Sequence, residues 1–316
     1  MSRITAIKKK EKTIFISGGS SGLGREAVKQ FLSENHTVVF TGRSIERIQE
    51  TITWVNPSQD ERQRLYGIVL DLESLTSIRE TVKTFKSLGI SSLDVLLNNA
   101  ARTTVNLEYV AETTKVEKTI FANTIGPWYL TLLLIPSLHP GSRILFVTSE
   151  LHNPKTNAPM SSAMSTKEIQ DPDLFDKLNG KGQPYSALPY YSISKLADVW
   201  ITYLFAKKFP DFSVNTFCPG LVPTTGLNRQ QSWLFLAFFR YILSRFPGAI
   251  TEHQSVTEYM YYATSDELEG VTGTYFTHGK QSESSERSKN MEEAARFWNL
   301  ACEICSTPEH TITTPL

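Results

Sequence analysis

The sequence predicts an α/β protein built on a single, doubly wound parallel sheet with helices on both faces. Short apolar runs rich in β-branched residues alternate with longer segments whose apolar residues recur at helical spacing. The runs are apolar nearly throughout, which is typical of parallel strands that are covered on both sides. Strands joined by helices form right-handed βαβ units, and such units predict a layered fold.

The expected elements follow one another from residue 12 onward. No linker interrupts the pattern, so the chain 1–316 is expected to form one domain with its core at about 10–300 and a mobile tail at about 307–316. The Ser/Glu-rich segment 281–289 is expected to be a surface loop. We predict strands at 12–19, 36–42, 65–72, 93–100, 142–149 and 212–220, and helices at 24–35, 44–55, 74–88, 116–138 and 189–209.

The composition argues against several classes of protein. The formal net charge is +0, so the whole-chain charge gives no reason to expect nucleic acid as a partner. The 3 Cys do not make a disulfide framework, which favours a reducing compartment. The 6 His lack metal-ligand spacing, so no metal is expected, and Cys302 and Cys305 are expected to pack inside. No apolar run long enough for a secretory signal follows the basic segment 1–12, so none is expected.

A glycine-rich turn follows the first expected strand. Its residues, Ser17-Gly18-Gly19-Ser20-Ser21-Gly22-Leu23-Gly24, lead directly into a helix. Glycines let a backbone approach a pyrophosphate closely, and a helix N-terminus offers unpaired N–H groups. The spacing differs from the G-x-G-x-x-G fingerprint, and the turn alone is also compatible with a simple strand-to-helix connection. Its position between a strand and a helix favours a dinucleotide site.

The end of the second expected strand indicates which dinucleotide is bound. In NAD-binding folds, an acidic residue about 20 residues beyond the loop holds the ribose 2′-hydroxyl. Here the strand ends in Arg43, whose guanidinium suits a 2′-phosphate. The sequence therefore predicts NADP(H). The alternative is that Arg43 is a solvated charge before the next helix, with Arg47 one turn further on.

Tyr191 and Lys195 form the strongest candidate for a reactive pair. Positions i and i+4 share one face of a helix, so both side chains project together. A free tyrosine has a pKa of about 10, and a nearby ammonium lowers that pKa by stabilising the phenolate. Ser149 ends the strand at 142–149 and is placed to hydrogen-bond a carbonyl oxygen. Asn123 lies within the helix at 116–138, where it weakens the helix locally and can leave a carbonyl for water.

These motifs together resemble the short-chain dehydrogenase/reductase family over nearly the whole chain. The loop is similar to TGxxxGxG, with Ser17 in place of Thr, and Asn98-Asn99-Ala100 is similar to NNAG, with Ala101 in place of Gly. Asp71 stands where the family places an adenine contact, and Pro219 to Thr224 is similar to PGxVxT. The residues that match the family's tetrad are Asn123, Ser149, Tyr191 and Lys195.

The resemblance implies a Rossmann-type fold and hydride transfer between nicotinamide C4 and a substrate carbon. Tyr191 would give or take the proton on oxygen, and Ser149 would orient that oxygen. Lys195 would tune Tyr191 and bind the nicotinamide ribose, while Asn123 would anchor a water that relays protons to Lys195. The implied cofactor contacts are Gly18, Ser20, Ser21, Gly22, Leu23, Gly24, Arg43, Asp71, Asn99, Tyr191, Lys195, Val222 and Thr224.

The C-terminal third resembles the retinol dehydrogenase and WW-domain oxidoreductase branch, which handles lipophilic carbonyls and alcohols such as retinoids, steroids or fatty aldehydes. One departure is the long stretch at about 150–190, expected to be a substrate loop over the surface near the site, where His152 is a candidate substrate contact. Two other classes remain open: an extended-family sugar epimerase or dehydratase, and an NADP(H)-binding regulatory or scaffold protein with little turnover.

The apolar segment 232–246 lies within an expected lid at about 226–250. It is rich in Trp, Phe and Leu, with Arg240 and Arg245 on a polar side, and is shorter than the roughly 20 residues needed to span a bilayer. It could line an internal pocket, lie in a membrane interface as well, or span a membrane. The expected location is the cytoplasmic side, with peripheral contact to endoplasmic reticulum or lipid droplets as one alternative.

Overall fold

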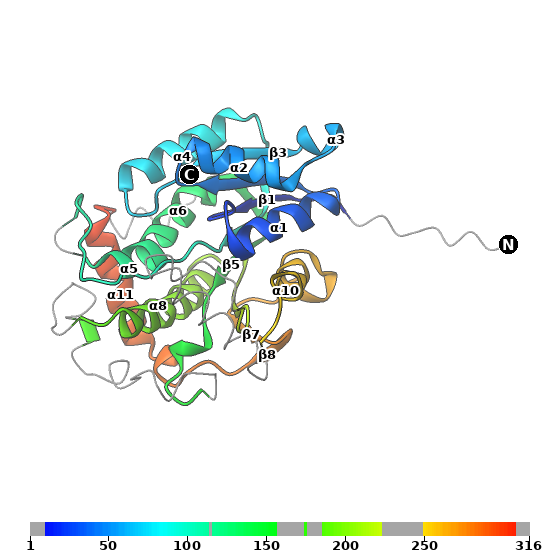
Figure 1. The fold of residues 1–316 in the computed structure, drawn as a ribbon. Coiled ribbons are helices and arrows are strands. Elements are labelled where there is room, and N and C mark those ends of the chain that lie inside the picture. Colours follow the sequence, from blue (N-terminus) through cyan, green and yellow to red (C-terminus); the bar gives the residue numbers. More distant parts are fainter. Residues whose placement is uncertain (1–9, 114–115, 157–173, 176–184, 223–248, 308–316) are drawn as a thin grey trace.

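A computed structural model describes residues 10–113, 116–156, 174–175, 185–222 and 249–307 (Figure 1). Its strands form one sheet in the order β3-β2-β1-β4-β5-β6-β7-β8. Every neighbouring pair is parallel except β7 with β8, so the predicted parallel α/β sheet is confirmed and gains an antiparallel edge strand. The strands are β1 (Thr13–Ile16), β2 (Thr37–Gly42), β3 (Leu65–Val69), β4 (Leu93–Asn98), β5 (Leu138–Val147), β6 (Ser213–Cys218), β7 (Thr274–Thr277) and β8 (Lys280–Ser282).

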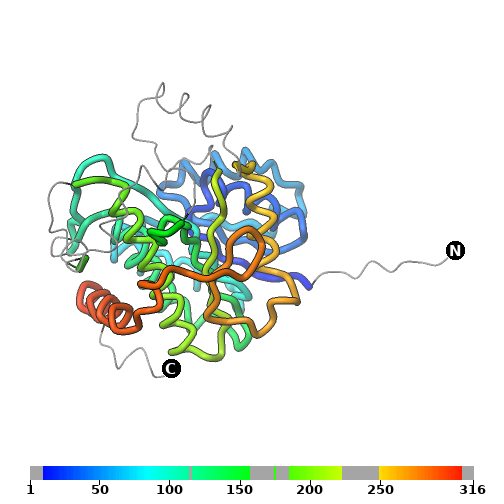
Figure 2. Tube along the Cα trace, turned by 90° about the horizontal axis from the view of Figure 1, so that it is seen from below, coloured from blue at the N-terminus to red at the C-terminus, as the bar shows by residue number. Residues whose placement is uncertain are grey.

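Helices cover both faces of the sheet. On one face lie α1, α2 and α10, and both views show α10, drawn in gold, beside the dark blue α1 (Figures 1 and 2). On the other face α4 packs on α6, and α8 packs on α5 and on the red α11. The helices are α1 (Gly22–Ser33), α2 (Ile45–Val55), α3 (Gln59–Arg62), α4 (Leu75–Ser87), α5 (Lys118–Ile120), α6 (Gly126–Leu134), α8 (Ala187–Lys208), α10 (Glu252–Thr264) and α11 (Met291–Ile304).

The two faces carry separate hydrophobic cores because neighbouring side chains of a strand point to opposite sides. In β1, Ile14 and Ile16 belong to the core under α1 and α10, whereas Phe15 belongs to the core under α4, α8 and α11. All three side chains are completely buried. This double burial explains why the strands are apolar at nearly every position.

The helix expected at 116–138 is interrupted. A π-helical turn occupies Phe121–Ile125 between α5 and α6, and a 3-10 turn follows at Ile135–Ser137. Strand β5 then begins at Leu138, four residues earlier than the sequence predicted. The sequence analysis also missed α10, although Thr251 and Gln254 form a capping box at its start, which is a signal visible in the sequence.

Two segments predicted to lie on the surface contribute to the interior, and both predictions were wrong in part. Within 281–289, Ser284, Ser285 and Ser288 are buried, because their hydroxyls are satisfied by one another and by backbone. Within the expected loop at 150–190, Leu174 and Phe175 are buried in the core under α8. Short apolar insertions of this kind have no period by which a sequence pattern could reveal them.

The order of the strands places the functional site. Strand β1 pairs with β2 on one side and with β4 on the other, so the chain changes direction across the sheet between β1 and β4. In open α/β sheets, ligands bind outside the carboxyl ends of the strands at such a switch point. The loops after β1, β2, β3, β4 and β5 all reach this edge.

Candidate active site

A cavity of about 430 Å³ lies at the carboxyl edge of the sheet, at the switch point. The loops after five strands and the first turns of α8 supply its walls, so segments distant in sequence meet in one space. The predicted site residues that line it are Gly18, Ser20, Ser21, Gly22, Leu23, Gly24, Arg43, Asp71, Asn99, Tyr191 and Lys195.

Three of the predicted residues that the structure describes do not line this cavity. Asn123 and Ser149 lie directly behind its wall, where Asn123 bonds to Arg102 and Ser149 to Tyr191. Val222 is buried at the end of the described segment after β6. Thr224 lies outside the described residues, as does nearly all of the expected lid at 226–250.

The glycine-rich turn is shaped by two close backbone approaches. A Cβ on Gly18, whose φ is +69°, would lie 2.8 Å from the Cα of Ala100, and a Cβ on Gly24 would lie 2.2 Å from the Gly18 carbonyl oxygen. Neither position accepts a side chain without movement of the backbone. Helix α1 begins at Gly22, so its first N–H groups face the cavity as an anion-binding end.

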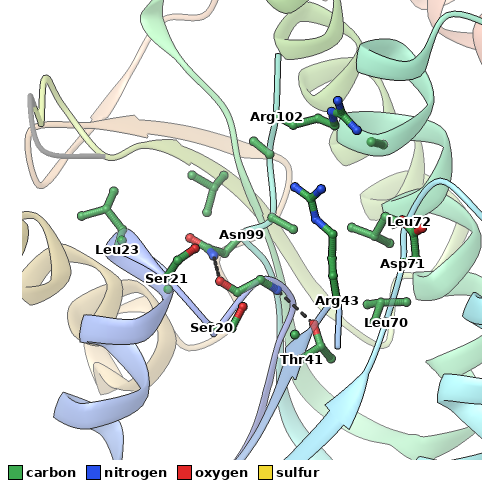
Figure 3. A pocket seen from close by; sticks show the side chains of 18 of the residues that line it. Ser20, Ser21, Leu23, Thr41, Arg43, Leu70, Asp71, Leu72, Asn99 and Arg102 are labelled. Atoms are coloured by element: carbon green, nitrogen blue, oxygen red, sulfur yellow. Dashed lines mark hydrogen bonds between the residues drawn. The ribbon is translucent and has the colours of Figure 1, made fainter. Parts of the chain in front are cut away.

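Hydrogen bonds tie the turn to the neighbouring strands. The Gly18 N–H donates to Thr41 Oγ1 at 3.0 Å, and Asn99 Nδ2 donates to the Gly18 carbonyl oxygen (Figure 3). Ser17 Oγ accepts from the Asn99 N–H at 3.1 Å, which explains why Ser replaces Thr there without loss of the contact. Tyr259 of α10 donates its hydroxyl to Asn99 Oδ1 at 3.0 Å. The sequence analysis missed Tyr259, because α10 was not predicted.

Arginine side chains enrich one end of the cavity in positive charge. Figure 3 shows Arg43 extending from the end of β2 past the wall of Leu70 and Leu72. Among the described residues Arg43 forms no ion pair, whereas Arg102 pairs with Glu73. Arg102 follows the Asn-Asn-Ala-Ala segment after β4 and was not predicted as a site residue. The only sign of Arg102 in the sequence was that Ala101, the residue before it, replaces the Gly of the family's NNAG pattern.

The tyrosine, lysine and serine meet at the other end of the cavity. Lys195 Nζ lies 5.6 Å from the centre of the Tyr191 ring, as expected for positions four apart on α8. Ser149 forms a side-chain hydrogen bond with Tyr191. Tyr191 is 8% exposed and Lys195 is 2% exposed, so both reactive groups are nearly sealed from bulk water while still lining the cavity.

The environment of Tyr191 differs from the sequence expectation. Burial raises the pKa of its hydroxyl above the usual 10, although Lys195 and the hydrogen bond with Ser149 act to lower it. The nearby ammonium therefore reduces the cost of the phenolate without overcoming burial. At neutral pH Tyr191 holds its proton, which is the state that a proton donor to a carbonyl oxygen requires.

Asn123 sits at the centre of the π-helical turn and is buried. Its Oδ1 accepts from the Arg102 N–H at 2.8 Å, and its Nδ2 donates to the Arg102 carbonyl oxygen at 2.9 Å and to Ser194 Oγ at 3.0 Å. The side chain thus ties the loop after β4 to α8. A π turn interrupts the α-helical hydrogen-bond ladder, and such turns occur frequently at functional sites.

His152 is a buried structural residue that holds neighbouring segments together, and not the substrate contact that the sequence suggested. Its ring is 1% exposed, with Nδ1 2.6 Å from the Ser149 carbonyl oxygen and Nε2 accepting from the Ser285 N–H at 3.2 Å. Because Nε2 accepts, Nδ1 carries the proton and donates it to Ser149. Burial lowers the pKa of His152 to about 4, so the ring is neutral at pH 7 and holds Ser149 without adding charge.

The cavity fits a dinucleotide on its own geometry. The backbone approach at Gly18 and the start of α1 suit a pyrophosphate, Arg43 suits a phosphate on the adenosine side, and Lys195 reaches the opposite end. A nicotinamide ring held there supplies or removes a hydride. The chain itself would orient a substrate oxygen through Ser149 and hold a proton at Tyr191 Oη. Within the described residues, no group of His, Cys, Asp and Glu gathers that could hold a metal ion.

Known proteins share both the sequence pattern and the fold. Residues 12–164 match the family model of short chain dehydrogenases. Polyprenol dehydrogenase of Mus musculus is 28% identical over 301 residues, covering 91% of this chain and 82% of that protein. The WW domain-containing oxidoreductase of Drosophila melanogaster is 25% identical over 308 residues, covering 95% and 70%. A metagenomic blue fluorescent protein solved in complex with NADPH has a TM-score of 0.59 at 21% identity, covering 84% of this chain and 96% of that one.

The fold and the cavity define the class of protein, a nicotinamide-dinucleotide oxidoreductase with its site at the carboxyl edge of a parallel sheet. More narrowly, residues 12–164 match the short-chain dehydrogenase family, and the chain resembles the branch that contains the WW domain-containing oxidoreductases over 95% of its length. The predicted family resemblance is thereby confirmed.

Proposed function

We propose that this protein is an NADP(H)-dependent oxidoreductase acting on a lipophilic carbonyl or alcohol, with Tyr191 as proton donor. The observation that carries the proposal is that one cavity joins the glycine-rich turn and Arg43 at one end to Tyr191 and Lys195 at the other. A binding protein without turnover has no need for a buried tyrosine beside a buried ammonium, since that pair costs free energy to desolvate.

Charge in the cavity supports NADP(H) over NAD(H). Arg43 and Arg47 both line the end proposed to receive the adenosine, and the residue directly after β2 is Arg43 rather than the acid that an NAD-specific site needs there. Asp71, the predicted adenine contact, lines the same end. The structural neighbour solved with NADPH shares the fold, so this fold accommodates the phosphorylated cofactor in at least one protein.

Two features support a lipophilic substrate. Polyprenol dehydrogenase is named for an alcohol with a long apolar chain and aligns with 91% of this chain. The segment 232–246 is strongly apolar in sequence and follows β6 along the chain, and β6 itself ends at the sheet edge where Tyr191 lines the cavity. Retinoids, steroids and fatty aldehydes are the candidate substrates within this class.

A substrate screen tests this proposal. Purified protein with NADPH is expected to reduce hydrophobic aldehydes or ketones, measured as the loss of NADPH absorbance, and to act weakly on small polar carbonyls. Short and long members of one aldehyde series isolate the contribution of the apolar chain. Each buried CH₂ contributes about 0.8 kcal/mol, so kcat/KM is expected to rise about fourfold per added methylene until the pocket is filled. Tight NADPH binding without turnover on any carbonyl would favour the regulatory alternative instead.

We further propose that the segment 232–246 contacts a lipid surface, which would place the protein at the cytoplasmic side of the endoplasmic reticulum or on lipid droplets. Wild-type protein is expected to float with liposomes, and Phe235→Ser/Phe239→Ser to remain in solution, because the insertion of aromatic side chains drives interfacial binding. The control is Ile45→Ser, which removes an apolar side chain that is 71% exposed elsewhere on the surface. If the wild-type protein does not float, the proposed lipid contact is wrong, and the remaining interpretation is that 232–246 is an apolar lid over the substrate pocket.

One described helical stretch, Lys118–Ser137, is long and apolar enough to cross a membrane by length and composition. It spans α5, the π turn and α6, and 78% of its most apolar 18-residue stretch is buried inside the protein. Buried core helices of soluble proteins are often as long and as apolar, so this stretch does not support a membrane span. The proposed lipid contact therefore depends on 232–246 alone.

A further inference from the structure

Asp198 lies three residues after Lys195 on α8, and the proposed chemistry does not use it. Both side chains are 2% exposed, and Lys195 Nζ lies 2.8 Å from Asp198 Oδ2. Within the part of the chain that the structure describes, Asp198 Oδ1 has no hydrogen-bond partner. A carboxylate that is buried and only partly satisfied is costly to keep, so its presence beside the reactive lysine calls for a functional account.

The contacts of Lys195 show what the carboxylate does to the ammonium. A lysine ammonium has three N–H donors. One donates to the Val147 carbonyl oxygen at 2.8 Å and one donates to Asp198. The third is left for the cavity, whose wall Lys195 forms. Two fixed acceptors thus set the orientation of the ammonium at 5.6 Å from the Tyr191 ring centre.

The carboxylate also changes the charge that Tyr191 experiences. An ammonium alone favours the phenolate, whereas an ion pair presents a much weaker positive field. Burial raises the pKa of Asp198 to about 6, with Lys195 acting against burial, so the group is ionised at neutral pH. Burial acts to lower the pKa of the Lys195 ammonium, but the charge and hydrogen bond of Asp198, together with Tyr191 and Cys218, raise this pKa overall. At neutral pH, therefore, Lys195 is an ammonium and Asp198 is a carboxylate.

Among the residues that the structure describes, the other elements packed around the pair add no charge at neutral pH. The thiol of Cys218, at the end of β6, faces both Lys195 and Tyr191, and burial raises the pKa of this thiol to about 12. Thr124, in the π turn, presents a neutral hydroxyl near Asp198 and donates its proton to the Ser194 carbonyl oxygen at 3.0 Å. Asp198 is thus the group that opposes Lys195 most closely.

We propose that Asp198 is a positioning residue that fixes the Lys195 ammonium and offsets its charge, so that Tyr191 keeps its proton and the site favours carbonyl reduction over alcohol oxidation. In reduction, the substrate oxygen takes the proton of Tyr191 Oη, which regains one from water, while the carbon takes the hydride that the reduced dinucleotide supplies. The direction of reaction rests on the proposed function, whereas the effect of Asp198 on Tyr191 does not.

The test is Asp198→Asn, which keeps the shape and an acceptor for Lys195 but removes the charge. The ionisation midpoint of Tyr191 is expected to fall by about one pH unit, because the ammonium is no longer opposed. The midpoint is read in cofactor-free protein from tyrosinate absorbance, as the difference from the same protein carrying Tyr191→Phe. With saturating cofactor and substrate at pH 7, the ratio of kcat for reduction to kcat for oxidation is expected to fall about tenfold.

Two further variants make the outcome decisive. Thr202→Val removes a hydroxyl that donates to the Asp198 backbone carbonyl one turn along α8, and it should leave the midpoint unchanged. Asp198→Ser gives a second neutral side chain, smaller than Asn, for use where Asn does not fold. A midpoint that stays the same or rises in the neutral variants overturns the proposal. A lowered midpoint in a protein that reduces no carbonyl supports the role of Asp198 and overturns only the proposed function.

Discussion

Tyr191→Phe is expected to reduce turnover about a thousandfold while leaving the affinity for NADPH nearly unchanged. The hydroxyl is the only part of the side chain that is removed, and it acts when the proton moves to the substrate oxygen. Loss of an interaction made only in the transition state lowers kcat and leaves cofactor binding intact. Stopped-flow measurement of NADPH oxidation and a fluorescence titration of NADPH in parallel separate the two effects.

Tyr190→Phe is the matched control for this experiment. Tyr190 is the adjacent residue and is also buried, but no lysine lies four residues after it. Its hydroxyl has no hydrogen-bond partner among the described residues, so removing it should cost neither stability nor activity. If the two variants kept similar activity, the tyrosine at 191 would not be the proton donor and the tetrad would have to be reassigned.

Arg43→Asp is expected to weaken NADPH binding about a hundredfold and to improve NADH binding. The change removes a charge-assisted contact with the 2′-phosphate and adds repulsion, and together these are worth a few kcal/mol. With NADH, the new carboxylate can accept from the free 2′-hydroxyl, as acidic residues do in NAD-specific sites. Fluorescence titration of both cofactors against both proteins gives the four affinities required.

Lys29→Asp provides the control for the change in net charge. Lys29 is exposed on α1 and does not line the cavity, and its ammonium lies over the ring of Trp54 instead. The same change from positive to negative charge there is expected to alter NADPH affinity only slightly, since exposed charges are screened by salt. Equal affinities of the wild type for NADPH and NADH would remove the role proposed for Arg43.

The sheet and the cavity could be anticipated from sequence because both depend on local patterns. Buried parallel strands are uniformly apolar, and the turn at Gly18 needs glycine for steric reasons that leave a recognisable spacing. Tyr191 and Lys195 are four residues apart on one helix, so their separation in space follows from helix geometry. These inferences need no knowledge of the tertiary fold.

What sequence reasoning missed depends on contacts between distant segments. Tyr259 reaches Asn99 across 160 positions, and Arg102 takes its partner Glu73 from the loop after a different strand. The effect of burial on the pKa of Tyr191 was also missed, because the number of atoms around the hydroxyl is a property of the folded state. The burial of Asp198 was missed for the same reason, because in the sequence Asp198 looks like an ordinary helix residue.

The hydrogen bond between His152 and the Ser285 N–H has a consequence for the order in which the site is completed during synthesis. The strands and loops that receive the dinucleotide, β1 to β4, all come from the first hundred residues. Ser149 is held by His152, and His152 is held by a residue 133 positions further along the chain. A nascent chain therefore makes its proposed nucleotide-binding half long before Ser149, the serine proposed to orient the substrate, is secured. A chain cut before residue 285 lacks that anchor, so the position of Ser149 depends on a residue that is synthesised well after the glycine-rich turn and the first four strands.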